Sequence, residues 1–513
     1  MENDAEKGRS YLLKVCLFAT GCAGIVAEFT LSTLASYLLG NTTLQWTMLM
    51  SLMLFAMGVG SRWSRLLTDR LLDRFIAIEF YLSALCATCA AAAYFGSALA
   101  LSAGVFIYGY GFAIGVLIGM EIPLVARMNE AYEDLRTNIA EVMEKDYFGA
   151  LIGGLLFAFF LLPELGLTYT PLALGVINFV VASVLLWRYR KLLERPKRLL
   201  AAFWILGFGL LALGFAIRPI VMYGEQSRYR DRVVYQTQTA YQRIVMTEWK
   251  GYHWLYLNGN VQFSTYDEER YHEPLVHPAM QLAESRDRVL ILGGGDGLAV
   301  REVVKYADVK TITLVDLDKA MIDLAQTHSV FVQANKKALD DPRVEVVVGD
   351  AGKYLENSDR LYNVIVVDLP DPKGPDLARL YSREFYRLCG RHLAAGGVLV
   401  TQASSPLHAR LAFVCIERTM ADAGFSTVPY HTYVPTMGDW GWVLGKKKDK
   451  DLVGQAYGLT FEGVETQFLN AEAMRGMLLF WKGMFDDQDA IDVSTEVEPT
   501  VDRYYRLSEW GVE

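Results

Sequence analysis

Five aspartates and one glutamine in the second half of the chain each end a short apolar run or lie in a turn that follows one. They are Asp296, Asp316, Asp350, Asp368, Asp371 and Gln402. Several carboxylates around one site favour a positively charged cofactor and a positively charged substrate, such as a sulfonium and a polyamine. A primary ammonium has a pKa of about 10 and is no nucleophile until it loses a proton. A carboxylate that holds the ammonium and accepts this proton frees the lone pair for attack.

The first of these acids lies in a glycine-rich turn, Gly293-Gly-Gly-Asp-Gly297. The apolar run 288–292 before it is typical of a buried parallel strand, and 298–306 after it has helical spacing. Glycines let the backbone approach a ligand and open onto the positive end of the helix. Strand, turn and helix predict the nucleotide-binding start of a doubly wound α/β domain. The spacing Gly-x-Gly-x-Gly differs from the dinucleotide fingerprint, so the turn alone is a weak signal.

Four further strands are expected downstream, and polar residues stand at their carboxyl ends. The strands are 311–316, 344–350, 362–368 and 397–402. In open α/β sheets ligands bind at these ends, where a carboxylate about 20 residues past the glycines contacts the ribose hydroxyls. The sequence therefore predicts Asp316 at a ribose and Asp350 at a base edge.

The segment before the glycine turn is polar and has the pattern of a small sheet. Residues 235–246 and 254–262 alternate as strands do, and Asn258-Gly259 suits a tight hairpin. Tyr271-His-Glu273 opens an expected helix. From the pattern alone His272 is better explained by an ordinary half-buried histidine than by a ligand-binding one.

The N-terminal part of the chain is apolar. The chain has 513 residues, is 52% hydrophobic and carries a formal net charge of −9, which argues against a nucleic-acid partner. A bilayer span needs about 20 apolar residues. Seven runs meet this length, namely 11–38, 42–61, 75–96, 99–126, 147–167, 169–187 and 199–222.

These patterns predict four parts. They are an all-α seven-helix transmembrane bundle at 1–222, a small antiparallel β domain at 223–287, a Rossmann-like, methyltransferase-type α/β domain at 288–447 and a C-terminal extension at 448–513. We expect a multi-pass protein of the cell (inner) membrane, with the lipid bilayer as a partner and no metal ion.

Basic residues crowd the second, fourth and sixth connections of the bundle and are missing from the first, third and fifth. The positive-inside rule then places the N-terminus in the cytoplasm, and seven spans place the α/β domain outside. A nucleoside cofactor made in the cytoplasm requires the opposite side. The sidedness of the α/β domain is therefore left open.

Three carboxylates, Glu28, Glu79 and Glu121, lie within apolar stretches. Charged groups are costly in hydrocarbon and usually face a bundle interior. Glu28 and Glu121 are compatible with a cation path or with buried hydrogen-bonded carboxyls. Glu79 lies close to the start of its expected span, so a functional role is expected less for it than for Glu28 and Glu121.

A series of ordered motifs makes residues 230–447 resemble the spermidine synthase family, the polyamine aminopropyltransferases, in a membrane-fused form. The motifs are Tyr241-Gln242, Leu257-Asn-Gly-Asn-Val-Gln262, Asp267-Glu268, Tyr271-His-Glu273, the turn at 293–297, Gly349-Asp-Ala351, Asp368-x-x-Asp-Pro372, Gly374-Pro375 and Pro435-Thr436. The resemblance implies aminopropyl transfer from decarboxylated S-adenosylmethionine to a polyamine, with putrescine as the default acceptor. It also implies a homodimer or larger homo-oligomer.

The resemblance also assigns roles to individual residues. Gln242, His272 and Asp296 would hold the cofactor's tail, with Asp296 on its amino group, and Gly293 and Gly295 would also bind the cofactor. Asp316 would bind the ribose, and Asp350 with Ala351 the adenine. Asp368 would be the base that deprotonates the attacking amine. Tyr271, Asp371 and Gln402 would line the polyamine groove.

The chain departs from the family pattern around the expected acceptor. It has Asn258 in place of Asp, Leu369-Pro370 between the two acids, Ala403-Ser404 after the glutamine, and Met437 in place of Tyr. The identity of the acceptor is therefore open. Two alternatives are an S-adenosylmethionine-dependent methyltransferase on the same fold, and a polyamine transporter or sensor whose soluble domain only binds.

Overall fold

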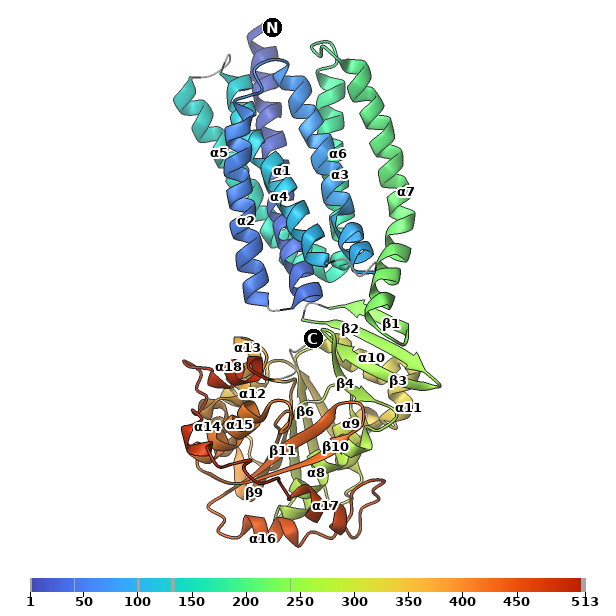
Figure 1. Cartoon of the computed structure of the whole chain (residues 1–513), viewed down its shortest axis with the longest axis vertical. Helices are drawn as coiled ribbons and strands as arrows, with labels where there is room; N and C mark the ends of the chain where they lie inside the picture. The colour runs from blue at the N-terminus through green and yellow to red at the C-terminus, as the bar shows by residue number, and fades with distance from the viewer. Residues whose placement is uncertain (1, 41, 99–101, 131–133, 240, 509–513) are drawn as a thin grey trace. The chain divides into compact units, whose positions relative to one another are not determined.

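The structure, a computed structural model, describes residues 2–40, 42–98, 102–130, 134–239 and 241–508, and the side chains of 2–13, 98 and 135 are outside this description. The chain divides into two compact units, residues 1–233 with 238–240 and residues 234–237 with 241–513. The first is helical and the second is mainly α/β (Figure 1).

The first unit is a bundle of long helices. Its α-helices are α1 (Glu2–Leu39), α2 (Thr42–Ser64), α3 (Leu71–Ala98), α4 (Ala103–Asn129), α5 (Leu135–Leu156), α6 (Gly166–Arg188) and α7 (Pro196–Arg228). The expected span 99–126 begins on residues outside the described ranges. The π-helical segment η1 (Phe157–Leu165) continues α5 and contains Pro163, which lacks the N–H of a regular helical hydrogen bond.

Six helical segments among the described residues are long and apolar enough to cross a membrane. They are 14–39, 42–64, 71–97, 103–129, 136–188 and 196–228. A straight helix of the 53 residues in 136–188 would be about 80 Å long, far more than the roughly 30 Å of a hydrocarbon core. The helix breaks at Gly166, whose φ of 61° and ψ of −174° are not helical. This break lies close to the expected division at residue 168. The number of spans and their insertion in a membrane stay predictions.

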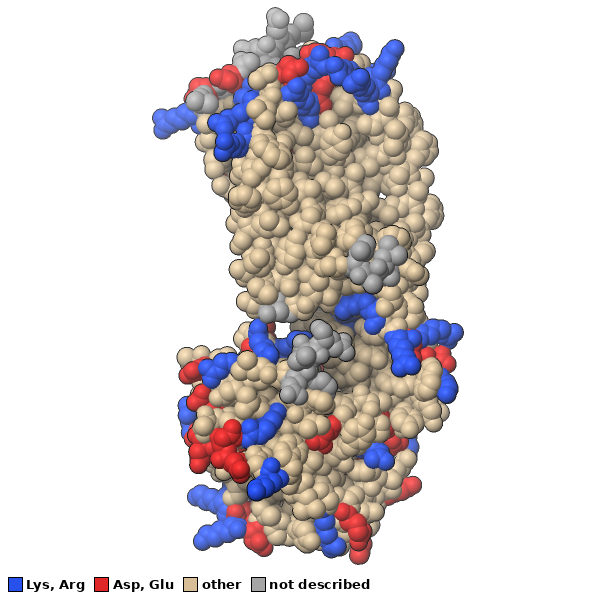
Figure 2. All heavy atoms as spheres, in the orientation of Figure 1, with Lys and Arg blue, Asp and Glu red and all other residues tan. Residues whose placement is uncertain are grey.

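The acidic residues of the bundle are enclosed. Glu28 is 9% exposed, Glu121 is 1% exposed and Glu79 is fully buried, although it was expected close to the start of its span. The reason is that α3 begins at Leu71, eight residues earlier, so that Glu79 lies more than two turns into the helix. Neither carboxylate oxygen of Glu79 has a hydrogen-bond partner among the described residues. Figure 2 shows Lys and Arg gathered at one end of the bundle, whereas the visible flank is almost free of charge.

The second unit begins with the small antiparallel sheet, in the order β1-β2-β3-β4. Its strands are β1 (Arg232–Gln238), β2 (Arg243–Trp249), β3 (Tyr252–Leu257) and β4 (Asn260–Ser264). Asn258 and Gly259 have φ angles of 51° and 84°, as a two-residue hairpin turn requires, which confirms that turn. The single strand expected over 235–246 is wrong, because the chain interrupts it between β1 and β2.

The main sheet has seven strands in the order β10-β11-β9-β8-β5-β6-β7. The strands are β5 (Arg288–Gly293), β6 (Thr311–Asp316), β7 (Val344–Val348), β8 (Tyr362–Asp368), β9 (Leu393–Gln402), β10 (Phe425–Val434) and β11 (Gly438–Lys447). β5 to β9 are parallel and match the five expected strands, except that β9 begins four residues earlier. The antiparallel strands β10 and β11 were not predicted.

Helices cover both faces of this sheet. They are α8 (Glu269–Leu282), α9 (Leu298–Val304), α10 (Lys319–Thr327), α11 (Ser329–Ala334), α12 (Ala351–Glu356), α13 (Pro375–Ala378), α14 (Arg383–Arg391), α15 (Arg410–Asp422), α16 (Leu452–Tyr457), α17 (Ala471–Met477) and α18 (Thr500–Arg506). Val289 and Ile291 of β5 pack in the core with α8 and α9. Leu290 and Leu292 pack in the opposite core with α14 and α15. A strand buried on both faces is apolar at every position, which explains why β5 was recognisable.

The C-terminal extension is attached to the α/β domain through Glu273 of α8. The buried carboxylate of Glu273 accepts hydrogen bonds from the backbone N–H groups of Gln467, Phe468 and Leu469 at 2.6, 2.9 and 2.8 Å. Three donors on one carboxylate satisfy backbone groups that would otherwise be buried without partners. Glu273 therefore fixes the path of the extension across the domain.

We predict that Glu273→Gln lowers the free energy of unfolding by about 2–4 kcal/mol, because the amide keeps only one acceptor oxygen for three donors. Urea unfolding of the full-length protein in detergent measures this change. The control is Glu472→Gln on α17, whose side chain is 80% exposed and should change stability little. Equal stability of the two variants would contradict the role of Glu273.

Candidate active site

The glycine turn lies directly against two aspartates from neighbouring strands. Gly293 pairs with Asp368 in the register of β5 and β8, and a Cβ atom at Gly293 would lie 2.0 Å from the Asp368 carbonyl oxygen. A Cβ at Gly295 would lie 2.8 Å from the Asp316 carboxylate carbon. No side chain fits at either position. These glycines are required by the close approach of backbone and carboxylates, whatever ligand binds.

Asp316 is held by backbone donors on both sides of the strand end. Its Oδ2 accepts from the N–H of Gly295 at 3.0 Å, and its Oδ1 accepts from the N–H of Asp318 at 2.9 Å. Asp318 in turn accepts a hydrogen bond of 2.9 Å from the side-chain amide of Gln242. The structure thus brings Gln242 to the end of β6, beside the residue expected at the ribose.

Asp368 lies at the end of β8 and is contacted by Tyr271. The Tyr271 hydroxyl donates to Asp368 Oδ1 at 2.8 Å. The Tyr271 ring lies 5.6 Å from the ring of Trp442 and 6.2 Å from that of Trp440, both on β11. Aromatic faces and a carboxylate together bind ammonium groups well. The strand that was not predicted therefore supplies one wall of the site.

His272 is fixed by a buried charge network behind the glycine turn. Its Nδ1 lies 2.9 Å from Glu268 Oε2, and Glu268 receives both terminal nitrogens of the Arg301 guanidinium. Arg301 belongs to α9, the helix that begins at the glycine turn. A guanidinium matches a carboxylate in this two-point geometry. The network ties the helix bearing His272 to the helix that follows the turn.

The electrostatics of the site follow from burial and from this network. Burial disfavours the charged imidazole of His272, but the hydrogen bond to Glu268 outweighs it and raises the pKa to about 9. Burial raises the pKa of Asp296 to about 6, while the nearby His272 acts in the opposite sense. Burial also raises the pKa of Asp368, again against His272 and Tyr271. At neutral pH the site holds a charged imidazole beside two carboxylates with raised proton affinity.

Asp350 lies at the end of β7, as expected, but its carboxylate is occupied by protein groups. Oδ1 caps α12 by accepting from the Lys353 N–H at 2.9 Å, and Oδ2 pairs with Arg379. Burial raises the pKa of Asp350, but these two interactions outweigh it, and the net shift is downward. Ala351 is buried as the first residue of α12. Contact of Asp350 with an adenine amino group stays a prediction.

Gln402 and Asp371 are also placed near the end of β8, with different surroundings. The Gln402 amide donates to the Leu369 carbonyl at 2.8 Å and accepts from the Ser404 N–H at 2.9 Å, so its polar atoms support the loop after β8. Asp371 Oδ2 accepts from Tyr505 of α18 at 2.9 Å. Asp371 Oδ1 is inaccessible to water and makes no hydrogen bond with the described residues.

Sequence reasoning missed several residues of this site, namely Arg301, Asp318, Arg379, Trp442 and Tyr505. Glu268 belongs to a motif recognised in the sequence, but no role was predicted for it. Arg301 is a charged residue on a helix whose other early positions are apolar, which is a weak signal of a buried pair. Tyr505 carries no local signal, since its partner lies 134 residues earlier.

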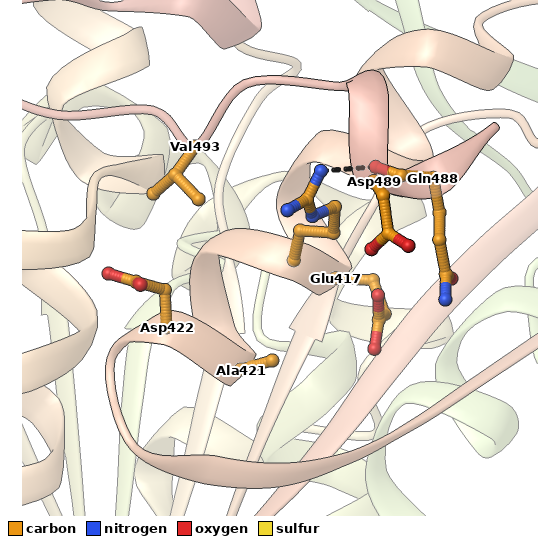
Figure 3. Close-up of a pocket in the computed structure, with 7 residues that line it drawn as sticks. Glu417, Ala421, Asp422, Gln488, Asp489 and Val493 are labelled. Atoms are coloured by element: carbon orange, nitrogen blue, oxygen red, sulfur yellow. Dashed lines mark hydrogen bonds between the residues drawn. The ribbon is translucent and has the colours of Figure 1, made fainter.

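Two surface cavities lie apart from the pair Asp296 and Asp368. One, of about 290 Å³, lies between α15 and the 3₁₀ turn η4 (Gln488–Ala490) and is drawn in Figure 3. Its lining includes Glu417, Asp422 and Asp489, and Arg418 donates to the Gln488 carbonyl across it. The other, of about 570 Å³, follows the edge strand β7 and includes Gly349 and Asp350. No group of three or more His, Cys, Asp or Glu among the described residues is arranged for a metal ion.

This arrangement can bind and deprotonate a cation. Asp296, Asp316 and Asp368 lie around the glycine turn from three different elements, and Tyr271 orients the last of them. A buried carboxylate with a raised pKa is a better proton acceptor near neutral pH than an exposed one. The geometry therefore suits attack by an amine on a positively charged nucleoside.

Known proteins resemble this chain over nearly its whole length. A family described as "Spermine/spermidine synthase domain" matches residues 268–455. Polyamine aminopropyltransferase 2 of Aquifex aeolicus is 40% identical over 506 residues, or 97% of this chain and 98% of that protein. Polyamine aminopropyltransferase 2 of Ralstonia nicotianae is 40% identical over 482 residues, or 91% and 92% of the two chains. A crystal structure of spermidine synthase with the transition state analogue AdoDATO, 27% identical, has a TM-score of 0.47 and covers 50% of this chain and 89% of that one.

We predict that affinity for decarboxylated S-adenosylmethionine falls as the pH drops through about 6. Asp296 has a pKa of about 6, so its negative charge is present above this pH and lost below it, whereas His272, with a pKa of about 9, stays charged throughout. Calorimetric titration of the full-length protein between pH 5 and 8 measures the effect.

Asp296→Asn should bind more weakly at pH 7.5 and lose most of the pH dependence. Asp323→Asn, on the exposed side of α10 where it pairs with Lys319, is the matched control and should behave as the wild type. A pH dependence that survives in Asp296→Asn would remove Asp296 from this role.

Proposed function

The chain belongs to the spermine/spermidine synthase family and is a polyamine aminopropyltransferase, and we propose that it uses decarboxylated S-adenosylmethionine as donor and putrescine as acceptor, releasing methylthioadenosine. The observation that carries the proposal is the position of Asp368 beside Tyr271 and the glycine turn. Methyl transfer, the alternative on this fold, is not the activity in the names of these relatives.

In the proposed reaction Asp368 acts on the amine. Its carboxylate holds the ammonium and takes one proton, and the free lone pair attacks the aminopropyl carbon bonded to sulfur. The carbon–sulfur bond breaks, a carbon–nitrogen bond forms and the sulfonium becomes a neutral thioether. Asp296 holds the amino group of the donor and Asp316 its ribose. Burial raises the pKa of Asp368, which favours this proton transfer.

The acceptor side of the site contains polar atoms that protein groups leave unused. Asp371 Oδ1, Ser404 Oγ and Trp440 Nε1 are inaccessible to water and make no hydrogen bonds with the described residues. Buried polar groups are normally paired, so unpaired ones in a site are available to a ligand. Asp371 suits the distal ammonium of a diamine, which supports putrescine or a close relative.

Incubation of the full-length protein with decarboxylated S-adenosylmethionine and single amines tests this function. We predict methylthioadenosine release with putrescine, and slower release with 1,3-diaminopropane, cadaverine or spermidine. Asp368→Asn should lower turnover by roughly 10²- to 10⁴-fold, because an amide accepts no proton, and should leave nucleoside binding largely intact. Chromatography of the nucleoside products measures the turnover of the wild type and of the variant.

The control variant is Asp359→Asn, which lies before β8, outside the site, and should turn over normally. Release of no methylthioadenosine with any amine would contradict the donor and acceptor. Normal turnover of Asp368→Asn would remove Asp368 from the role of base.

We further propose that the helical unit is a multi-pass anchor in the cell membrane and that the protein is a homo-oligomer. The supporting observation is the set of six long apolar segments with charge gathered at one end of the bundle (Figure 2). Charged side chains exposed to hydrocarbon would be costly, which agrees with the scarcity of charge on the flank.

A second candidate function, cation transport by the bundle, is favoured by Glu79. Its two carboxylate oxygens and one of those of Glu121 are buried and unpartnered among the described residues. Intramembrane carboxylates of this kind mark cation or proton paths in other membrane proteins.

Proteoliposomes loaded with radiolabelled putrescine test transport directly. We predict efflux that Glu79→Gln and Glu121→Gln each reduce at least tenfold. Glu194→Gln, in the connection between α6 and α7, is the control and should leave efflux unchanged. Absence of efflux from the wild-type vesicles, or efflux that neither variant changes, would contradict transport.

A further inference from the structure

The C-terminal helix α18 contacts the loop that follows β8 at two points. Asp502 Oδ1 accepts from the N–H of Gly374 at 2.7 Å, and the Tyr505 hydroxyl donates to Asp371 Oδ2 at 2.9 Å. This loop carries Asp371 and begins directly after Asp368. The extension, in which the sequence shows no catalytic motif, therefore reaches the acceptor side of the site.

Helix α18 is anchored independently of Tyr505. Val501 is fully buried in the core that includes α15, and Thr500 is 3% exposed. Asp502 also accepts from the Arg506 guanidinium at 2.9 Å. With its backbone held by these contacts, the helix presents the Tyr505 hydroxyl at a fixed position.

The hydrogen bond leaves one oxygen of Asp371 available. Oδ2 is engaged by Tyr505, while Oδ1 is shielded from water and has no hydrogen bond with the described residues. Tyr271, which donates to Asp368, also lies within electrostatic reach of Asp371. Asp368 and Asp371 therefore supply two carboxylates to the site, which suits a diamine with an ammonium at each end.

We propose that Tyr505 is a positioning residue for the amine acceptor, holding Asp371 so that its free oxygen binds the ammonium distant from the reacting nitrogen. This inference rests on the proposed function. It gives the C-terminal extension a part in acceptor recognition. Burial raises the pKa of Asp371 to about 6, and the Tyr505 hydrogen bond, with smaller contributions from Ser404 and Gln402, counters this by stabilising the carboxylate.

Tyr505→Phe tests the inference, with Tyr504→Phe as its matched control. Tyr504 is the neighbouring half-buried tyrosine on the same helix, and its hydroxyl donates to Asp492 at 3.2 Å, away from the loop. We predict that Tyr505→Phe raises KM for putrescine about tenfold with kcat within about twofold, since the lost bond is to a charged group. The dissociation constant for decarboxylated S-adenosylmethionine should not change.

The pH profile separates positioning from general support. Without the hydrogen bond the pKa of Asp371 rises, so the acid limb of kcat/KM for putrescine should move to higher pH in Tyr505→Phe and stay in place in Tyr504→Phe. In an Asp371→Asn background, Tyr505→Phe should add no further change in KM.

Three results would overturn the inference. The first is equal kinetics for Tyr505→Phe and Tyr504→Phe. The second is a loss of nucleoside affinity in Tyr505→Phe as large as its rise in KM for putrescine. The third is a rise in KM from Tyr505→Phe that is just as large in the Asp371→Asn background. Each presupposes turnover by the wild type. A wild type that releases no methylthioadenosine contradicts the proposed function instead, so the two failures are distinguishable.

Discussion

The close approach of the turn 293–297 to two carboxylates is the constraint on which the site depends. Gly293 and Gly295 leave no room for a Cβ against Asp368 and Asp316, so the strands β5, β6 and β8 can meet in register only around glycine. Because the same contacts gather negative charge at the sheet edge, the fold itself creates affinity for a cation. The ends of the parallel strands thus become both a packing point and a binding site.

Gathering carboxylates in a partly buried place raises their proton affinity, and the network behind the turn limits this effect. Glu268 and Arg301 hold His272 charged beside Asp296 and Asp368. A protonated imidazole there lowers the cost of two ionised aspartates. The network joins α8 to α9, so the same residues hold the two helices together and balance the charge of the site.

The core of the α/β domain was largely predictable, and its acceptor side was not. β5, β6 and β8 are mainly apolar because parallel strands are buried on both faces, and each ends in glycine or aspartate as expected. β10 and β11 escaped prediction because their Gly, Pro and charged residues interrupt the alternation that marks a strand. Trp442 on β11 consequently entered the site only with the structure.

The sequence by itself determined the positions of the strand-end acids, the glycine turn and the apolar character of the N-terminal helices. Each of these features depends only on local spacing and composition. Only the tertiary structure decided which polar atoms are already occupied. The polar atoms of Gln402 and Asp350 are hydrogen-bonded to other protein groups. Asp371 has one oxygen bonded to Tyr505, 134 residues away, and its other oxygen has no hydrogen bond with the described residues. Pairing between distant segments has no local signature, because side-chain contacts depend on how the whole chain packs.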